Sequence, residues 1–111
     1  MSTSTKSRHR QSVETLRKDG YKVRVYHGRI FTTNQPNYAD VCMSKRDAEG
    51  ELDPAYYLSS FGGFTSVEVT TPDGRDYIGK FNFSPNRQFN RKLGLRAAVG
   101  RALIGHTDCF N

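Results

Sequence analysis

Residues 64–83 decide the fold of this chain, and they read FTSVEVTT, PDGR and DYIGKFNF. On both sides of the PDGR segment polar and apolar residues alternate, which is the pattern of two half-buried β-strands. Asp73 and Gly74 supply the positive φ that a tight turn requires. The sequence therefore predicts a β-hairpin with one apolar, aromatic face. That face carries Val67, Val69 and Thr71 from the first strand and Tyr77, Gly79, Phe81 and Phe83 from the second.

A helix is predicted to follow the hairpin, over residues 84–103. Ser84 is a suitable N-cap, and Pro85 suits the first helical position because no N–H is needed there. At about 100° per residue, five apolar or small residues fall within one arc of about 80°, which predicts a seam that packs on the aromatic face of the hairpin. The residues of this seam are Phe89, Leu93, Ala97, Gly100 and Ile104.

Upstream of the hairpin the pattern is weaker. Residues 12–18 predict a short helix that stops at Gly20, and residues 21–33 alternate as a strand in which Gly28 permits a bulge or turn. Residues 34–60 predict a long loop, because three helix- or strand-breaking residues interrupt them. These breakers are Pro36, Gly50 and Pro54.

The length of 111 residues allows one modest hydrophobic core. Residues 1–10 have no apolar residue after Met1, which predicts a disordered basic tail. Residues 11–111 then form a single α+β domain. We expect a small antiparallel sheet of three or four strands with the C-terminal helix packed on one face. Its exposed sheet edges favour a homodimer or a higher homo-oligomer.

The net charge is +6, and the two ends of the chain carry it. Residues 1–10 hold a charge of +3 and residues 84–111 hold +4, whereas the middle of the chain is close to neutral. This distribution favours an anionic partner that is approached by both ends. The alternative is a solubilising tail together with a solvated helix face.

The C-terminal helix is the predicted binding surface. Arg87, Arg91 and Arg101 share an arc with Gly94 and Ala98, and such small residues would let an extended ligand lie across the helix while guanidinium groups bind its phosphates. Close helix packing is the alternative role of the glycine. Lys92 and Arg96 lie on a third side of the helix. For these two residues, the alternative to ligand binding is pairing with acidic groups of the sheet or of another subunit. The predicted ligand-binding residues are Arg87, Asn90, Arg91, Arg96 and Arg101.

Three aromatic residues near flexible glycines are candidates for stacking against bases, namely Tyr56, Tyr57 and Phe61. Aromatic side chains are also the usual filling of a small core, so a structural role is the alternative.

The sequence contains no catalytic motif, and we expect neither an enzyme nor a cofactor. His9, His27 and His106 lack the spacing of metal ligands, and the acidic segment 47–53 lacks the ligand pattern of a calcium loop. Cys42 and Cys109 are interpreted as two free thiols. No apolar run has the length of a membrane span, and no secretory signal is present. We therefore expect a protein of the cytoplasm without a membrane partner.

The second half of the chain resembles small, mostly uncharacterised proteins of bacteriophages and prophages. The resemblance rests on residues 67–75, on Gly79, and on residues 89–94 and 98–103. It implies a two-layer α+β protein in the host cytoplasm but no agreed activity. The chain departs from the pattern at Leu95, where an arginine often follows the glycine. One class of phage proteins of this size sequesters nucleotide signals of host immunity, and the comparison with that class is an analogy only.

Two hypotheses for the function follow. The first is a non-catalytic accessory protein of the phage type, with an anti-defence role among its possible uses, that binds a phosphate-bearing ligand, either nucleic acid or a nucleotide signal. The second is a protein-interaction inhibitor that docks on an acidic surface of a host enzyme.

Overall fold

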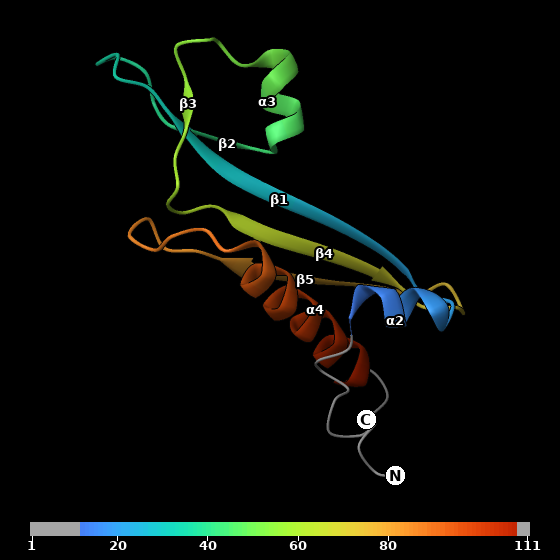
Figure 1. Cartoon of the computed structure of the whole chain (residues 1–111). Helices are drawn as coiled ribbons and strands as arrows, with labels where there is room; N and C mark the ends of the chain where they lie inside the picture. The colour runs from blue at the N-terminus through green and yellow to red at the C-terminus, as the bar shows by residue number, and fades with distance from the viewer. Residues whose placement is uncertain (1–11, 109–111) are drawn as a thin grey trace.

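A five-stranded antiparallel sheet with the long helix α4 on one face forms the body of the protein (Figure 1). The computed structural model describes the backbone of residues 12–108 and the side chains of residues 12–104, so the predicted basic tail and Cys109 lie outside the described residues. The α+β class and the packing of the C-terminal helix on the sheet are confirmed. In chain order the elements are α2 (Val13–Lys18), β1 (Lys22–Thr32), β2 (Val41–Met43), α3 (Lys45–Glu51), β3 (Tyr57–Leu58), β4 (Phe64–Thr70), β5 (Asp76–Asn82) and α4 (Arg91–Asp108).

The predicted hairpin is present as β4 and β5. Val67 lies opposite Gly79 and Val69 lies opposite Tyr77, so that the alternating apolar positions face the same side. Val67 and Val69 are fully buried there. Gly74 in the connecting turn has a φ of 92°, the left-handed conformation for which glycine was predicted at this position. Alternation and turn chemistry together therefore determine this part of the fold.

β1 is one long strand that serves two parts of the sheet. The strand order is β2-β1-β4-β5, and β3 also pairs with β1. Residues 22–28 of β1 pair with β4, whereas its last residues pair with β2 and β3. The bulge or turn that Gly28 permits is not formed, because the strand continues through this residue. A Cβ atom at Gly28 would lie only 2.2 Å from Cε1 of Phe64, so the glycine makes room for that ring.

The predicted loop over residues 34–60 is also wrong, because it contains β2, α3 and β3. Ser44 caps α3, and its hydroxyl accepts a hydrogen bond from the Asp47 N–H at 3.1 Å. These elements are two to seven residues long. β2 and β3 are held in place by pairing with the last residues of β1. Patterns this short carry little periodicity in the sequence, which explains the error.

The C-terminal helix begins at Arg91, seven residues after the predicted N-cap. Residues 84–90 form a turn and a short bridge to the preceding segment instead. The Arg87 N–H donates to the Ser84 carbonyl at 3.0 Å, and the Phe89 N–H donates to the Ser60 carbonyl at 2.8 Å. Asn90 is the residue that caps α4, because its Oδ1 accepts from the Leu93 N–H at 3.0 Å.

The buried face of α4 differs from the predicted seam. Ile104 of that seam is 45% exposed. The residues that α4 buries in the core are Ala98, Val99, Ala102 and Leu103. This face is selected by Gly79 of β5, where a Cβ atom would lie 1.9 Å from the Ala98 carbonyl oxygen. Helix and strand therefore touch backbone to backbone.

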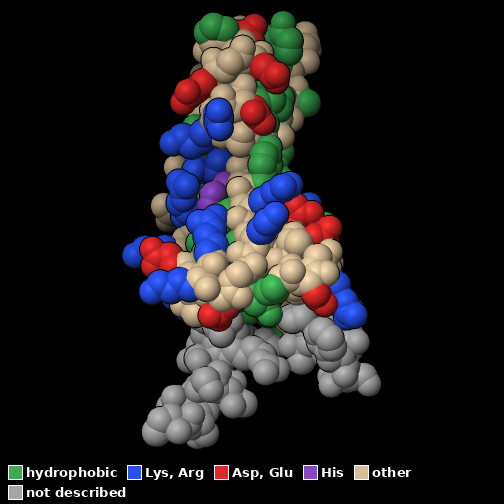
Figure 2. Space-filling view, turned by 90° about the vertical axis from the view of Figure 1, so that its right-hand side faces the viewer, with side chains coloured by type: hydrophobic (Ala, Val, Ile, Leu, Met, Phe, Trp, Pro, Cys, Tyr) green, Lys and Arg blue, Asp and Glu red, His purple; other side chains and the backbone are tan. Residues whose placement is uncertain are grey.

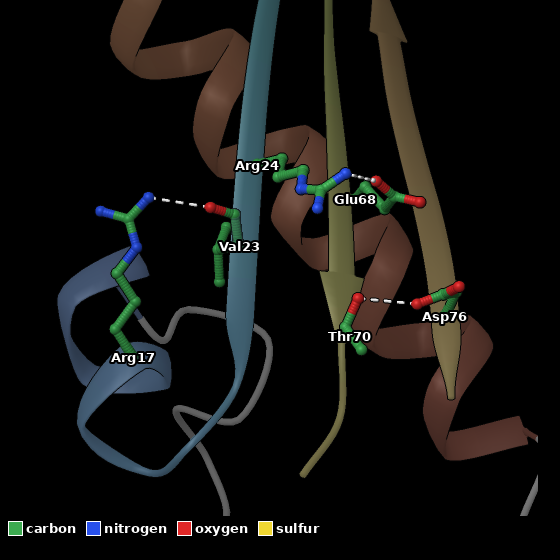
Figure 3. A network of polar contacts seen from close by, with 6 residues as sticks. All are labelled: Arg17, Val23, Arg24, Glu68, Thr70 and Asp76. Carbon is green, nitrogen blue, oxygen red and sulfur yellow. Dashed lines mark hydrogen bonds and ion pairs between the residues drawn. The ribbon is translucent and has the colours of Figure 1, made fainter. Parts of the chain in front are cut away.

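Helix α2 completes the core at the end of the sheet where β1 begins (Figure 1). Its Leu16 is buried together with Val23 of β1 and with Val99 and Leu103 of α4. Arg17 ties the helix to the strand, since its Nη2 donates to the Val23 carbonyl at 2.8 Å (Figure 3). The short N-terminal helix is thus present where the sequence predicts it.

We predict that Gly79→Ala destabilises the protein by about 2 kcal/mol or more, because the added methyl forces α4 away from β5. Gly50→Ala is the control, since this helical position has no neighbour within 4 Å of an added Cβ. There the change should be neutral or stabilising by about 0.5–1 kcal/mol. Urea denaturation followed by circular dichroism measures both. Equal effects at the two positions would contradict the close contact.

We also predict that Asn90→Ala lowers the free energy of unfolding by about 1 kcal/mol, because the first turn of α4 loses its capping acceptor. Ser84→Ala should leave stability within about 0.5 kcal/mol, as is usual for an exposed position with no such role. The same denaturation assay separates the two. If Ser84→Ala lowered the free energy of unfolding more than Asn90→Ala does, the helix would begin with Ser84 as its N-cap, as the sequence predicts.

Candidate functional site

A basic cleft opens between β1, the start of α3 and the start of α4. Its volume is about 540 Å³. Basic side chains from all three elements line it, with Asp47 as the acidic residue of the lining. Figure 2 shows Lys and Arg side chains gathered around a histidine on this side of the molecule. The basic residues of the cleft are His27, Arg29, Lys45, Arg46 and Arg91.

Arg29 is held in the cleft by an aromatic contact. Its guanidinium carbon lies 4.1 Å from the centroid of the Phe89 ring, a cation–π arrangement. Its Nη2 donates to the Ser59 carbonyl over a long 3.4 Å. The Nε atom is buried and has no hydrogen-bond partner in the described chain. The guanidinium is therefore fixed in position with donor capacity left over.

His27 is half-buried beside Phe89 and Thr65. Its Nδ1 shares a hydrogen bond of 2.8 Å with Oγ1 of Thr65, and its ring meets the Phe89 ring edge-on with centroids 5.7 Å apart. Burial lowers the pKa of His27, and the positive charges of Arg91 and Arg29 lower it further. The imidazole is thus biased toward its neutral form by neighbours that would themselves attract an anion.

Arg91 is the first residue of α4, and its side chain has no hydrogen bond or ion pair with a described residue. The first turn of this 18-residue helix contains no acidic residue. A positive charge at a helix N-terminus is unfavourable because it opposes the helix dipole. Burial lowers the pKa of Arg29, and the positive charge of Arg91 lowers it further. The two guanidinium groups therefore repel each other. An anion between them would relieve both conflicts.

The edge of β1 adds backbone groups to the cleft. The Ile30 carbonyl accepts from Ser59 on the β3 side, whereas the Val23 carbonyl accepts from Arg17 on the opposite side. Because successive residues of a strand turn their N–H and C=O groups to opposite edges, the N–H of His27 faces the edge away from β4. Neither α2 nor β2 pairs with β1 at this position. His27, a residue of the cleft lining, therefore turns its main-chain N–H toward this edge of the sheet.

Carboxylates do not neutralise the cleft. Within the described residues the ion pairs are Arg24 with Glu68 at 3.6 Å and Arg75 with Asp73 at 3.5 Å. The first pair lies on the open face of the sheet (Figure 3) and the second in the hairpin turn. Neither pair involves a basic residue of the cleft.

The structure separates the arginines that the sequence placed together. Arg91 lines the cleft, whereas Arg87 and Arg101 lie near the ring of Phe81, at 5.9 and 5.2 Å from its centroid. Arg101 also donates to the Lys80 carbonyl on β5. The predicted common arc is wrong because Arg87 precedes the helix.

Three further predictions for the helix have different outcomes. Gly94 is buried against Thr65 and Phe83, so close packing, the alternative role, is the correct one. Asn90 uses its Oδ1 as the N-cap of α4, and its amide Nδ2 is left as the donor for the predicted ligand role. Arg96 is exposed on α4 and contacts no described partner, so it remains available.

The predicted stacking residues lie outside the basic cleft. Tyr56 and Tyr57 line a second hollow of about 250 Å³ beside α3, and their hydroxyls donate to the Ala39 carbonyl and to Oδ1 of Asn34. Phe61 is half exposed and forms a bridge with Gln88. Tyr26 and Phe89 are the phenyl-ring side chains in the lining of the cleft instead.

Neither His27 nor Arg29 is among the ligand-binding residues that the sequence predicts. Their spacing of two residues on a predicted strand does place both side chains on one face, which is a usable signal. It is weak, because only the packing of α4 brings Arg91 to the same place.

No group of three His, Cys, Asp or Glu residues that could hold a metal ion occurs in the part of the chain that the structure describes. Cys42 is exposed on β2 with a free thiol, and burial of part of the group raises the pKa of that thiol. The helices within residues 12–108 include none that is long and apolar enough to cross a membrane.

Comparison of the chain with models of known protein families, with curated proteins and with solved structures finds no match. The cleft itself is therefore the feature that points to a function.

We predict that Arg91→Gln raises the pKa of His27, because one of the charges that disfavour the imidazolium is removed. A lowered pKa of a native histidine means that folding stability falls as pH drops below about 6.5, where the unfolded state binds the proton first. The variant should show a smaller fall. NMR titration of the His27 ring and urea denaturation at several pH values measure these effects. An unchanged His27 pKa would place Arg91 away from the ring.

Proposed function

We propose that this protein is a non-catalytic binding protein and that its ligand carries phosphate, bound in the cleft around His27, Arg29 and Arg91. The observation that carries the proposal is the convergence of these three basic side chains without a carboxylate partner in the described chain. The like charges of Arg29 and Arg91 disfavour each other in the free protein, and an anion turns the same arrangement into an attractive one.

Each group has a separate part in such binding. Arg29 presents donors from a position fixed by Phe89, and planar guanidinium groups match phosphate oxygens well. Arg91 adds a second guanidinium at the positive end of the α4 dipole. His27 contributes its main-chain N–H and, once a phosphate lies beside it, gains protons more readily.

The proposal keeps the accessory role of the first hypothesis drawn from the sequence. Nucleic acid and a nucleotide signal both provide the required phosphate. The docking of a host enzyme is not favoured by a comparable feature, since the cleft is concave and basic rather than a flat recognition surface. A phosphate ligand thus uses the most distinctive chemistry of the described chain.

Binding of inorganic phosphate or AMP tests the proposal. We expect either probe to shift the His27 ring signals in NMR spectra and to raise the pKa of His27, because the bound anion stabilises the imidazolium. Arg29→Gln and Arg91→Gln should each weaken this response at least tenfold, whereas Arg101→Gln, on the β5 side of α4, should preserve it. The absence of any response at millimolar probe, or equal loss in all three variants, would refute the site.

A further inference from the structure

We propose that the ligand is double-stranded nucleic acid, held by its phosphate backbone along a basic band that extends beyond the cleft. This inference rests on the proposed function, since the cleft is the centre of the band. The band runs from the start of α3 through the cleft to the exposed side of α4. Its members are His27, Arg29, Lys45, Arg46, Arg91, Lys92 and Arg96.

Helix geometry places Lys92 and Arg96 on the same side of the molecule as the cleft. Residues 92, 96, 99 and 103 are spaced by four, three and four positions, so they form one strip along α4. Val99 and Leu103 of this strip pack in the core with Leu16 of α2 and Val23 of β1. The strip therefore faces the β1 side. Lys92 and Arg96 continue it, at the rim, toward the N-terminus of the helix where the cleft lies.

Apart from Arg29 and His27, which are held in the cleft, the basic residues of the band are unengaged. Lys45, Arg46, Arg91, Lys92 and Arg96 are all exposed, and none has a hydrogen bond or ion pair with a described residue. Arg24, by contrast, pairs with Glu68, and the Lys80 ammonium lies 4.3 Å from the Phe64 ring centroid. Lys18 and Lys22 are equally free, but they lie at the other end of β1. Figure 2 shows the concentration of Lys and Arg on this side.

A band of this kind fits a polymer better than a single nucleotide. One phosphate occupies the cleft alone and leaves Lys92 and Arg96 without a role. A nucleic acid presents phosphates at regular short intervals, so that several can be neutralised at once, with release of counterions. The cations on α3 and α4 lie on opposite sides of the cleft, as a continuous backbone requires.

The aromatic residues of the cleft favour a duplex over a single strand. Proteins that bind single strands stack bases on free aromatic rings. Phe89 is covered by the Arg29 guanidinium and packs against His27 and Phe83. Tyr26 is stacked on Phe64, and its hydroxyl accepts from the Ser44 N–H at 3.0 Å. Tyr26 is still 40% exposed, but the Phe64 stack and the Ser44 hydrogen bond hold its ring in place. Cations beside rings that are held by protein contacts suit recognition of backbone phosphates, which a duplex displays with its bases enclosed.

Fluorescence anisotropy with a labelled 20-base-pair duplex tests the inference. Binding of duplex RNA and duplex DNA is measured over a range of KCl concentrations, with the matching single strand as a third probe, so that the RNA and DNA arms identify which backbone is preferred. We expect a linear fall of log K with log salt, with a slope of about −0.9 for each phosphate neutralised on DNA. The single strand should bind at least tenfold more weakly.

The decisive variant is the double substitution Lys92→Ala with Arg96→Ala. It should weaken duplex binding and reduce the salt slope by about 2, because two phosphate contacts are lost. The matched control is Lys18→Ala with Lys22→Ala, which removes the same charge at the other end of β1 and should leave the slope unchanged. Circular dichroism verifies that both variants are folded.

The outcomes separate this inference from the proposed function. If phosphate shifts His27 but the duplex does not bind, or if both double variants lose the same slope, the band is refuted and the phosphate cleft stands. Equal binding of single strand and duplex also refutes the preference. If neither phosphate nor duplex binds, both proposals fail.

Discussion

The contact between Gly79 of β5 and the backbone of α4 at Ala98 and Ala102 is the constraint on which the rest of the structure depends. Any side chain at position 79 would overlap the helix, so the two backbones fix each other's position. One turn earlier in α4, Gly94 leaves room for two side chains, those of Thr65 on β4 and of Phe83. Two glycines thus set both the height and the rotation of α4 above the sheet. A helix held this way must begin near the cleft, and Arg91 is brought to β1 as a result.

Thr65 connects this packing to the chemistry of the cleft. It is fully buried and lies against Gly94, and its hydroxyl also shares the hydrogen bond with Nδ1 of His27. The packing of α4 on the sheet and the orientation of the His27 imidazole therefore both depend on the Thr65 side chain. Arg29 is fixed independently, through the ring of Phe89. The cleft is consequently preformed by the core, and a ligand meets groups that need little reordering.

The parts of the fold that sequence reasoning predicted are those governed by local rules. Alternation and the Asp73-Gly74 turn define the hairpin, because strand period and positive φ are properties of neighbouring residues. The start of α4 was mispredicted at Ser84, although the local signal was good, because Phe89 is hydrogen-bonded to Ser60 and the chain stays extended there. The buried face was mispredicted for a related reason, since Gly79 on another element selects it. Tertiary contacts overrode local preference in both cases.

The candidate site, too, is only partly determined by local sequence and depends otherwise on tertiary contacts. Arg91 was predicted from the basic character of the helix, but its partners His27 and Arg29 come from a strand more than 60 residues earlier, and only the packing of α4 on the sheet joins them. The acidic residues of segment 47–53 lie on and after α3, and the first turn of α4 contains none. A fold optimised for stability alone would place an acid at that turn, beside two arginines and a helix N-terminus. Because no acidic residue compensates the charge of Arg91, the free protein is slightly destabilised. The same missing negative charge is the driving force with which the cleft would attract phosphate.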